Sequence, residues 1–340
     1  MYITDFLRKK TGFLLFLPLL AGCGREPETS VKAGPELPPH FPAPVYQAVQ
    51  NPYSEAGIEL GKALFHEPML SRDGSVSCGT CHDQVHAFAD HNVPLSMGVG
   101  GAIGKRNAPP VQNVIWYKHF MWDGSIRHIE VMPIAPITEP LEMAANWDTL
   151  LTRLRASEKY RNLFFKAFGS EQIDDQKMLK ALAQYMATLV SAGSRYDAYV
   201  QGKGSLAPDE LQGLELFRAQ CASCHTEPLF TDQSFVYNGL DVVSADIGRM
   251  LITRKEEDRG SFKVPSLRNV SLTYPYMHDG RFRTLEQVLD HYTSYKSGKP
   301  LADARVRNIR LSPEEKRALI AFLKTLTDYD FVSNPKHALR

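Results

Sequence analysis

Two short segments place a pair of cysteines and a histidine at a spacing that suits covalent attachment of haem. Residues 78–82 read CGTCH and residues 221–225 read CASCH. In each segment the two thiols can form thioether bonds to the haem vinyl groups, and the adjoining histidine can bind the iron. A zinc site or a redox dithiol is disfavoured because each cysteine pair has its own histidine. The sequence predicts two c-type haems, held by Cys78, Cys81, His82, Cys221, Cys224 and His225.

The two haem motifs lie in halves of the chain that repeat one another. The segment Trp122-Asp123-Gly124 recurs 156 positions later as His278-Asp279-Gly280, and several flanking residues recur at the same offset. An internal repeat of this kind indicates a duplicated structural unit. We therefore predict two cytochrome c-like haem domains related by duplication, an N-terminal one at 52–203 and a C-terminal one at 204–340.

Helical patterns dominate the elements that must position these motifs. Apolar residues have helical spacing over 58–65, and a long apolar stripe runs through 174–200. Ser312 and Glu315 make a capping box, with Pro313 at the first helical position. Alternating strand patterns are scarce. The predicted fold is mainly α, with long loops.

The first 23 residues have the features of an export signal. Basic residues precede an apolar run that is too short to cross a bilayer. The run ends in the tetrapeptide LAGC at 20–23, which resembles a bacterial lipoprotein cleavage site with Cys23 as the lipidated residue. An uncleaved anchor or an ordinary secretory signal is the alternative. Residues 24–51 are rich in proline and would form a tether, so we expect a protein on the periplasmic side of the envelope.

Composition narrows the function further. The chain has 340 residues, enough for two domains, and a net charge of +1 that gives no case for nucleic-acid binding. All five cysteines have an assignment, Cys23 in the signal and four in the haem motifs. No cysteine is left over for a disulfide.

The two halves differ where a sixth iron ligand would be supplied. In the second half, Tyr292 follows the repeated turn, and the equivalent position of the first half is Pro136, which cannot bind iron. The first half instead carries Glu139 and Glu142 in a loop punctuated by prolines. Such a loop can hold a carboxylate over a haem. On the residues alone, a solvated loop charge is the simpler interpretation of Glu142.

With these motifs the chain resembles the bacterial di-haem cytochrome c peroxidase family, including its MauG-like branch. The resemblance spans roughly residues 52–328 and rests on the two haem motifs and on the segments 106–109, 120–124, 136–143 and 275–280. It implies two cytochrome c-like domains, of which the N-terminal haem reacts with peroxide and the C-terminal haem transfers electrons.

The resemblance also implies roles for individual residues. Glu142 matches the acid–base carboxylate over the first haem, and Trp122 matches a tryptophan that relays electrons between the haems. Asn107, Thr273 and Pro275 match a calcium site, the last two through their backbone carbonyls. Core packing is the alternative for Trp122, and a turn position is the alternative for Asn107.

Val99 departs from the pattern of other family members. Many of them have at this position a histidine that caps the iron of the first haem until reduction releases it, and valine cannot bind iron. His86 or His91 could substitute, although a lone histidine usually has a structural role. We predict that the His82 haem keeps an open position at rest.

Two further departures concern the second haem and the peroxide pocket. Tyr292 stands where the classical members have a methionine ligand. MauG-like enzymes also have a tyrosine there, and an oxygen ligand of this kind would favour ferric iron. Met277 is a nearby competitor, but its repeat equivalent is Met121, which favours core packing for both. Met132 replaces a glutamine of the peroxide pocket and makes that pocket less polar.

Three functions are consistent with these features. The first is reduction of hydrogen peroxide with electrons from a donor protein, a cytochrome c or a cupredoxin. The second is MauG-like oxidation of tryptophan or tyrosine side chains of a partner protein, which Val99 and Tyr292 favour. The third is a non-catalytic electron carrier, which would require six ligands at both irons.

Overall fold

The computed structural model describes residues 34–90, 92–241, 244–294 and 302–338, and contacts group Ala33–Arg340 as one compact unit. The predicted export signal, its Cys23 and the first part of the tether lie outside the described residues. None of the helices within the described ranges combines the length and the apolar character that a membrane span requires.

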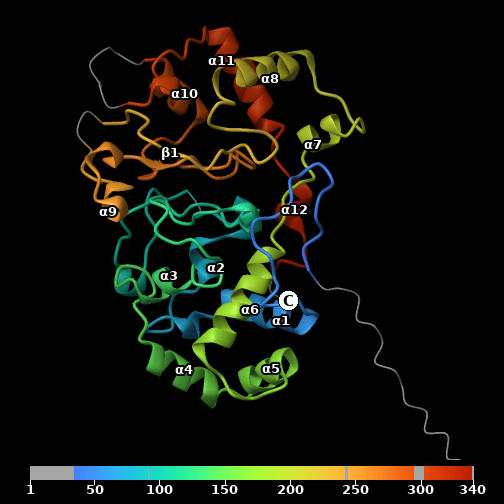
Figure 1. Cartoon of the computed structure of the whole chain (residues 1–340), viewed down its shortest axis with the longest axis vertical. Helices are drawn as coiled ribbons and strands as arrows, with labels where there is room; N and C mark the ends of the chain where they lie inside the picture. The colour runs from blue at the N-terminus through green and yellow to red at the C-terminus, as the bar shows by residue number, and fades with distance from the viewer. Residues whose placement is uncertain (1–33, 91, 242–243, 295–301, 339–340) are drawn as a thin grey trace, which may run out of the picture. The chain divides into compact units, whose positions relative to one another are not determined.

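The described chain is mainly helical, as predicted, with long connecting loops (Figure 1). The α-helices are α1 (Glu55–Phe65), α2 (Cys78–Cys81), α3 (Ile134–Thr138), α4 (Trp147–Ala156), α5 (Glu158–Phe168), α6 (Asp175–Ala187), α7 (Arg195–Val200), α8 (Pro208–Gln220), α9 (Met250–Thr253), α10 (Leu285–Thr293), α11 (Pro313–Lys324) and α12 (Tyr329–Ser333). Short 3₁₀ turns occur at Pro68–Leu70, Gln84–His86, Val99–Gly101, Val114–Trp116, Glu256–Asp258 and Ala304–Val306. Two short strands, β1 (Phe235–Val236) and β2 (Phe262–Lys263), pair antiparallel.

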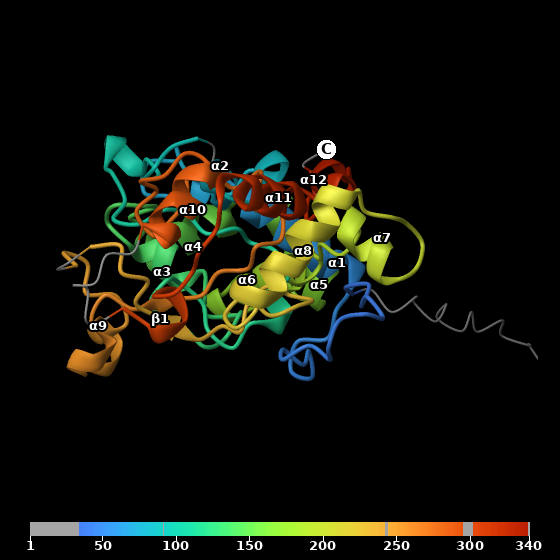
Figure 2. The same ribbon diagram turned by 90° about the horizontal axis from the view of Figure 1, so that it is seen from above.

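The same helix crossing occurs in both halves of the chain. In the first half α1 packs on α6, and in the second half α8 packs on α11, as the views from two directions show (Figures 1 and 2). A Cβ atom on Gly61 would lie 1.9 Å from the carbonyl oxygen of Ala181, and one on Gly213 would lie 2.1 Å from that of Ala318. Each crossing therefore needs a glycine, because the two backbones touch there.

The repeated turns also share their backbone conformation. Phe120 bridges Ile126, and 156 positions later Tyr276 bridges Phe282. Met121 and Met277 follow the first bridge residue in each turn, and both have positive φ angles, 63° and 74°. Positive φ is uncommon for residues other than glycine, so the match supports the predicted duplication in three dimensions.

The stripe 174–200 does not form one continuous helix, because α6 ends at Ala187 and α7 begins at Arg195. Between α6 and α7 the backbone N–H of Ser191 donates to Asn113 Oδ1 at 2.9 Å, and the Ser191 hydroxyl donates to Asp328 at 3.0 Å. These side chains replace the bonds that a continuing helix would make, and Ser194 caps the start of α7. The break therefore depends on residues distant in sequence.

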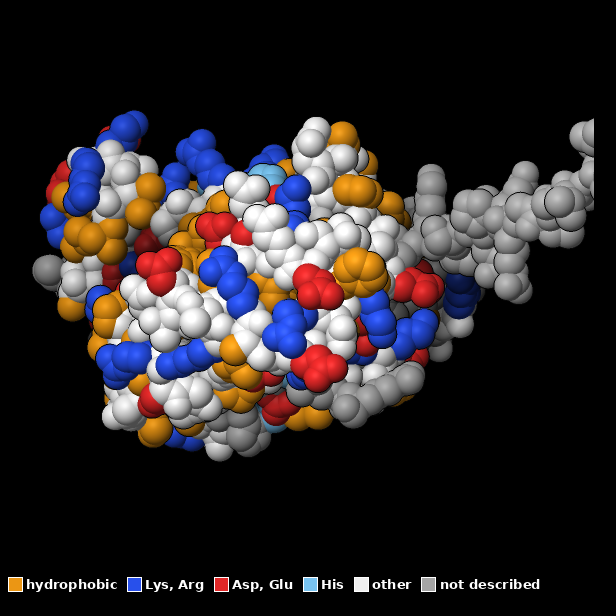
Figure 3. Space-filling model, turned by 90° about the horizontal axis from the view of Figure 1, so that it is seen from below, with side chains coloured by type: hydrophobic (Ala, Val, Ile, Leu, Met, Phe, Trp, Pro, Cys, Tyr) orange, Lys and Arg blue, Asp and Glu red, His pale blue; other side chains and the backbone are white. Residues whose placement is uncertain are grey.

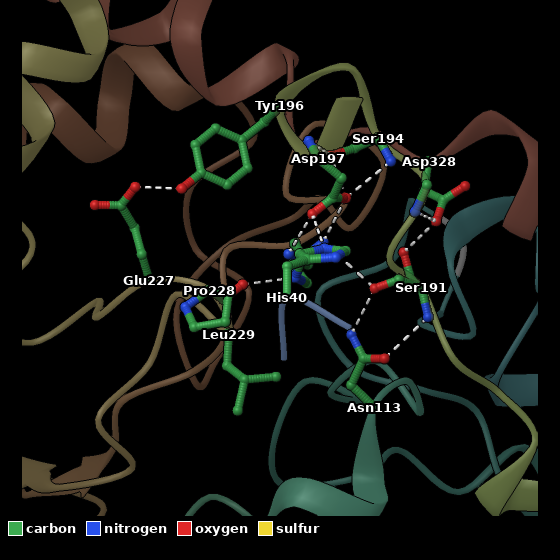
Figure 4. A network of polar contacts seen from close by, with 12 residues as sticks. His40, Asn113, Ser191, Ser194, Tyr196, Asp197, Glu227, Pro228, Leu229 and Asp328 are labelled. Carbon is green, nitrogen blue, oxygen red and sulfur yellow. Dashed lines mark hydrogen bonds and ion pairs between the residues drawn. The ribbon is translucent and has the colours of Figure 1, made fainter. Parts of the chain in front are cut away.

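A buried polar network joins the two halves at this break (Figure 4). Arg268 and Asp197 are both 0% exposed and form a bidentate ion pair with N–O distances of 2.8 and 2.9 Å. Burial acts to raise the pKa of Asp197, but the Arg268 guanidinium and the Ser194 hydroxyl override it and lower the pKa to about 2. His40 Nε2 lies 2.9 Å from the same carboxylate. The pair fixes Arg268 of the second half against α7.

The end of the described chain returns to the first half. Phe331 and Val332 of α12 pack into the apolar core that α1 and α6 contribute to. The Gln84 amide donates to the carbonyl oxygen of Asn334 at 2.8 Å, and the Tyr185 hydroxyl donates to that of His337 at 2.8 Å. A second apolar core, with members from Tyr196 to Leu326, lies around α8 and α11.

Candidate active site at the two haem motifs

The first haem motif forms a short helix that is followed by its histidine. Cys78 and Cys81 bound α2, and Ser77 and Thr80 cap it through a capping box. His82 follows, and its Nδ1 lies 2.8 Å from the carbonyl oxygen of Phe88. Because a carbonyl only accepts hydrogen bonds, we infer that Nδ1 carries the proton and that Nε2 is the nitrogen left to bind iron.

The second motif orients its histidine in the same way. His225 Nδ1 lies 3.1 Å from the carbonyl oxygens of both Phe230 and Pro265. Burial lowers the pKa of His225, as it does that of His82, and neutral imidazole is the form that binds a metal. The two histidines therefore fit haem-iron ligation.

The four motif cysteines are unbridged; Cys224 is buried, and the other three are partly buried. Burial raises the pKa of Cys78 to about 12, that of Cys81 to about 11 and that of Cys221 to about 12. A reactive dithiol needs a lowered pKa, so these values argue against disulfide exchange. The described ranges contain no group of three or more His, Cys, Asp or Glu side chains placed to hold a metal ion.

Glu142 lies close enough to the first motif to act on it electrostatically. Its charge raises the pKa of both Cys78 and Cys81. The pKa of Glu142 itself is raised, first by partial desolvation and then by Glu139, whereas Lys105 lowers it. The side chain keeps solvent access all the same, so the surrounding protein crowds the carboxyl without enclosing it. The structure thus brings the predicted acid–base residue to the first haem motif.

The loop of Val99 is attached to the backbone of Glu142. The Val99 N–H donates to the Glu142 carbonyl oxygen at 2.8 Å, and the Val99 side chain is only 2% exposed. A Cβ atom on Gly98 would lie 2.1 Å from the carbonyl oxygen of Leu141, so the two segments touch. A hydrocarbon side chain therefore occupies the position next to the candidate acid–base group.

The other residues considered for the first haem are His86, His91 and Met132. His86 Nδ1 lies 3.0 Å from Asp83 Oδ2, a local pair within the loop after the motif. His91 lies outside the described residues. Met132 packs against the apolar core of the first half, which suits a structural side chain as much as a pocket residue.

The Asn238 side chain contacts both candidate sixth ligands of the second haem, Met277 and Tyr292. Its amide nitrogen donates to Met277 Sδ at 3.5 Å, and its amide also bonds the Tyr292 side chain. The Leu240 N–H donates to Asn238 Oδ1 at 3.1 Å, which fixes the direction of the amide. Sequence reasoning missed Asn238, because nothing local marks a residue 54 positions from the tyrosine that it contacts.

Tyr292 lies on α10 and faces the second haem motif. Burial raises its pKa, the Asn238 amide opposes this, and the charges of Cys221 and Cys224 raise the pKa further. Electrostatic coupling to both cysteines places the phenol beside the motif. The structure thus brings Tyr292 near the second pair of cysteines, and ligation of iron by this residue stays a prediction.

Trp122 connects segments of the two halves. Its indole Nε1 donates to the carbonyl oxygen of Asn107 at 2.7 Å, and its own carbonyl oxygen accepts from the Lys263 N–H at 2.8 Å. Its ring centroid lies 6.5 Å from that of Phe262, which stacks on His278 at 3.9 Å. An aromatic series therefore runs from Trp122 to the repeated turn of the second half.

Asn107 is held close to the loop that contains the other candidate calcium ligands. Its N–H donates to the His278 carbonyl oxygen at 2.7 Å, and its amide nitrogen donates to that of Pro94 at 3.1 Å. The amide oxygen of this buried side chain is thereby turned away from Pro94. Thr273 and Pro275 precede His278 in the same loop, and the calcium site stays a prediction.

Comparison with known proteins decides the family. A family model described as di-haem cytochrome c peroxidase matches residues 55–205, and one described as cytochrome c matches residues 211–327. The methylamine utilization protein MauG of Methylorubrum extorquens is 39% identical over 298 residues, which cover 86% of this chain and 82% of that protein. The chain belongs to the di-haem cytochrome c peroxidase family.

Further relatives agree with this family. Cytochrome c551 peroxidase of Nitrosomonas europaea is 36% identical over 276 residues, 79% of each chain. A crystal structure of a MauG-like protein associated with microbial copper homeostasis has a TM-score of 0.82 at 33% identity, covering 89% of this chain and 98% of that one. As a di-haem cytochrome c peroxidase family member, the protein is an oxidoreductase with two c-type haems, which confirms the predicted fold, family and main cofactor.

Proposed function

We propose that this family member reduces hydrogen peroxide to water at the haem of His82, using electrons that a donor protein delivers through the haem of His225. The observation that carries the proposal is the contact between Val99 and Glu142. Valine cannot bind iron, and its backbone is bonded to that of the candidate acid–base residue at 2.8 Å. When bound, the haem supplies the redox chemistry for peroxide.

Glu142 manages the protons. Each peroxide takes up two electrons and two protons and yields two water molecules. The Glu142 carboxylate accepts a proton from one peroxide oxygen and returns it to the other, which becomes the leaving water. A pKa above that of an ordinary glutamate suits this exchange, because the group must both take up and release a proton.

Trp122 serves as the electron relay between the halves. Its indole is held by Asn107 and its backbone by Lys263, so its position is fixed from both sides. Tyr292 would bind the iron of the His225 haem, which its place beside Cys221 and Cys224 supports. Calcium held by Asn107, Thr273 and Pro275 would stiffen the segment behind Trp122.

The cellular setting follows from the N-terminal sequence. An export signal and Cys23 support a protein on the periplasmic side of a bacterial envelope, anchored by lipid on that cysteine. The donor is then a periplasmic electron carrier, a cytochrome c or a cupredoxin. Positive and negative side chains are interspersed on the face drawn in Figure 3, which supports a protein partner rather than nucleic acid.

The second candidate function is MauG-like oxidation of tryptophan or tyrosine side chains of a partner protein. Tyr292, with its Asn238 contact, favours it because an oxygen ligand stabilises high oxidation states of iron. A non-catalytic electron carrier would require a protein ligand on both faces of each haem, and the Val99 loop argues against that.

One experiment separates these functions. The ferric holoprotein is mixed with hydrogen peroxide in a stopped-flow instrument, with and without reduced cytochrome c. Rapid oxidation of the cytochrome supports the peroxidase, whereas a fast peroxide reaction without cytochrome oxidation supports the MauG-like function. No reaction with peroxide, together with two low-spin ferric haems, would contradict both and leave electron carriage. Glu142→Gln should slow the peroxide step about 100-fold or more without loss of haem.

A further inference from the structure

Cationic side chains gather beside the Trp122 turn. Burial lowers the pKa of His119, and the charges of Arg249, Arg127 and Lys263 lower it further. These groups therefore lie near one another. The Nδ1 atom of His119 is buried and has no hydrogen-bond partner in the structure.

Two of these three cations have their charge stabilised without a further anion: Arg249 by protein groups and Arg127 by water. The Arg249 guanidinium donates to the carbonyl oxygens of Asp123 and Gly124 at 2.8 and 3.0 Å and lies 4.1 Å from the Phe235 ring centroid. Asp123 is the nearby carboxylate, but it pairs with Arg106 at 2.7 Å. Arg127 is exposed to water.

Lys263 is the exception. Its Nζ lies 4.9 Å from the Tyr117 ring centroid, and among the described residues no carboxylate comes within ion-pair distance of it. Desolvation lowers the pKa of this half-buried amine to about 8, so it is still mainly protonated at neutral pH. A charge removed from water without a partner is costly, and proteins normally pair it.

The position of Lys263 indicates which anion is meant. Its N–H holds the Trp122 carbonyl oxygen at 2.8 Å, and two residues later the Pro265 carbonyl oxygen lies 3.1 Å from His225 Nδ1. Val264, between them, packs against Cys224. A single extended segment thus runs from the tryptophan to the second haem motif. A haem attached at Cys221 and Cys224 would bring two propionate carboxylates, the anionic groups that such a cofactor carries.

We propose that Lys263 is a positioning residue that binds a propionate carboxylate of the haem attached at Cys221 and Cys224. One extended segment would then anchor this haem through three groups: the Lys263 ammonium, the Val264 side chain and the Pro265 carbonyl. The ammonium also favours ferrous over ferric iron, because it stabilises the form with less positive charge. The inference deepens the proposed electron transfer but does not depend on Glu142 or on the identity of the donor.

The test compares two lysines of the holoprotein. Lys263→Met removes the half-buried charge, and Lys118→Met removes an exposed charge from the same neighbourhood. The midpoint potential of each haem is measured by spectroelectrochemical titration. We expect Lys263→Met to lower the potential of the His225 haem, so that its ferrous-to-ferric ratio at a fixed potential falls about tenfold. Lys118→Met should leave it unchanged, and Lys263→Arg should preserve it.

Three outcomes would overturn the proposal. An unchanged potential in Lys263→Met would do so, as would an equal shift in Lys118→Met, or a shift confined to the His82 haem. If Lys263→Met loses haem, Lys263→Gln keeps a polar side chain without the charge and must show the same lowered potential. Peroxide reactivity is recorded separately, so failure of the proposed function leaves the potential measurement intact.

Discussion

The backbone N–H of Val99 donates a 2.8 Å hydrogen bond to the carbonyl oxygen of Glu142. This bond links the position to which the family resemblance assigns an iron-binding histidine with the residue proposed to move protons. The two positions therefore cannot move independently. A ligand introduced at 99 would enter the space that Glu142 serves.

Val99→His should convert the resting His82 haem from an open to a capped state. The imidazole would start from a backbone that is already held beside Glu142, so little rearrangement is needed. We expect loss of the high-spin ferric signal in electron paramagnetic resonance and a slow peroxide reaction that prior reduction restores. Val99→Leu is the control and should keep the signal; a high-spin signal that persists in Val99→His would contradict this geometry.

The pH profile of the peroxide step should report on Glu142. The reaction needs the ionised carboxylate, so its rate should rise with pH through the pKa of this group and then level off. Because Glu139 raises that pKa and Lys105 lowers it, Glu139→Gln should move the acid limb to lower pH and Lys105→Met to higher pH. Stopped-flow rates over a pH series measure the direction of each shift. If both variants move the acid limb in the same direction, or each moves it opposite to the expected direction, Glu142 does not carry out the proton transfer.

Asn238→Leu should weaken the preference of the second haem for Tyr292 over Met277 as its iron ligand. The amide bonds Tyr292 and also donates to Met277 Sδ at 3.5 Å, so its loss frees the thioether while weakening the hold on the phenol. We expect an altered near-infrared spectrum, with a methionine–iron charge-transfer band if the thioether takes over. Adding Met277→Leu to the variant should abolish that band. A spectrum unchanged from that of the wild type would mean that Asn238 does not hold the ligand.

Asp197→Asn should destabilise the protein strongly, because it leaves Arg268 buried without its counter-charge. The expected loss is about 3–5 kcal/mol of unfolding free energy, measured by urea denaturation. In the wild type the Asp197 pKa is lowered to about 2, so its contribution is complete above the unfolded-state value near 4 and fades as pH falls from about 4 to 2. Asp197→Asn should lack this acid-dependent component; a wild-type pH dependence in the variant would disprove the assignment.

Gly61→Ala and Gly213→Ala should each cost about 1–3 kcal/mol through overpacking. The added Cβ would meet a backbone carbonyl at 1.9 or 2.1 Å, and a helix backbone cannot yield easily. Gly104→Ala is the matched control, since its Cβ would meet its nearest atom at 3.4 Å. Thermal unfolding of the three holoproteins provides the comparison, and equal stabilities would show that the crossings can relax.

Sequence reasoning reached the parts of the site that lie in local motifs. The haem cysteines and histidines have fixed spacing, and the offset between the halves singles out Tyr292 as a candidate ligand from the residues alone. The capping box at Ser312 and the start of α11 at Pro313 are equally local, and the structure has both.

The remaining features depend on pairing across long stretches of chain, which no local pattern encodes. The carbonyl of Pro265 orients His225 from 40 residues away, and Arg268 pairs with Asp197 from 71 residues away. The end of α6 at Ala187 has the same cause, because Ser191 exchanges helical bonds for Asn113 and Asp328. Tertiary partners decide these positions against the helical stripe.

The return of α12 to the first half has a consequence for biosynthesis. Phe331 and Val332 complete a core whose other members all precede them in the chain, and the His337 carbonyl is the partner of the Tyr185 hydroxyl. The first half therefore cannot reach its final packing until α12 and His337 have been synthesised and have packed against it.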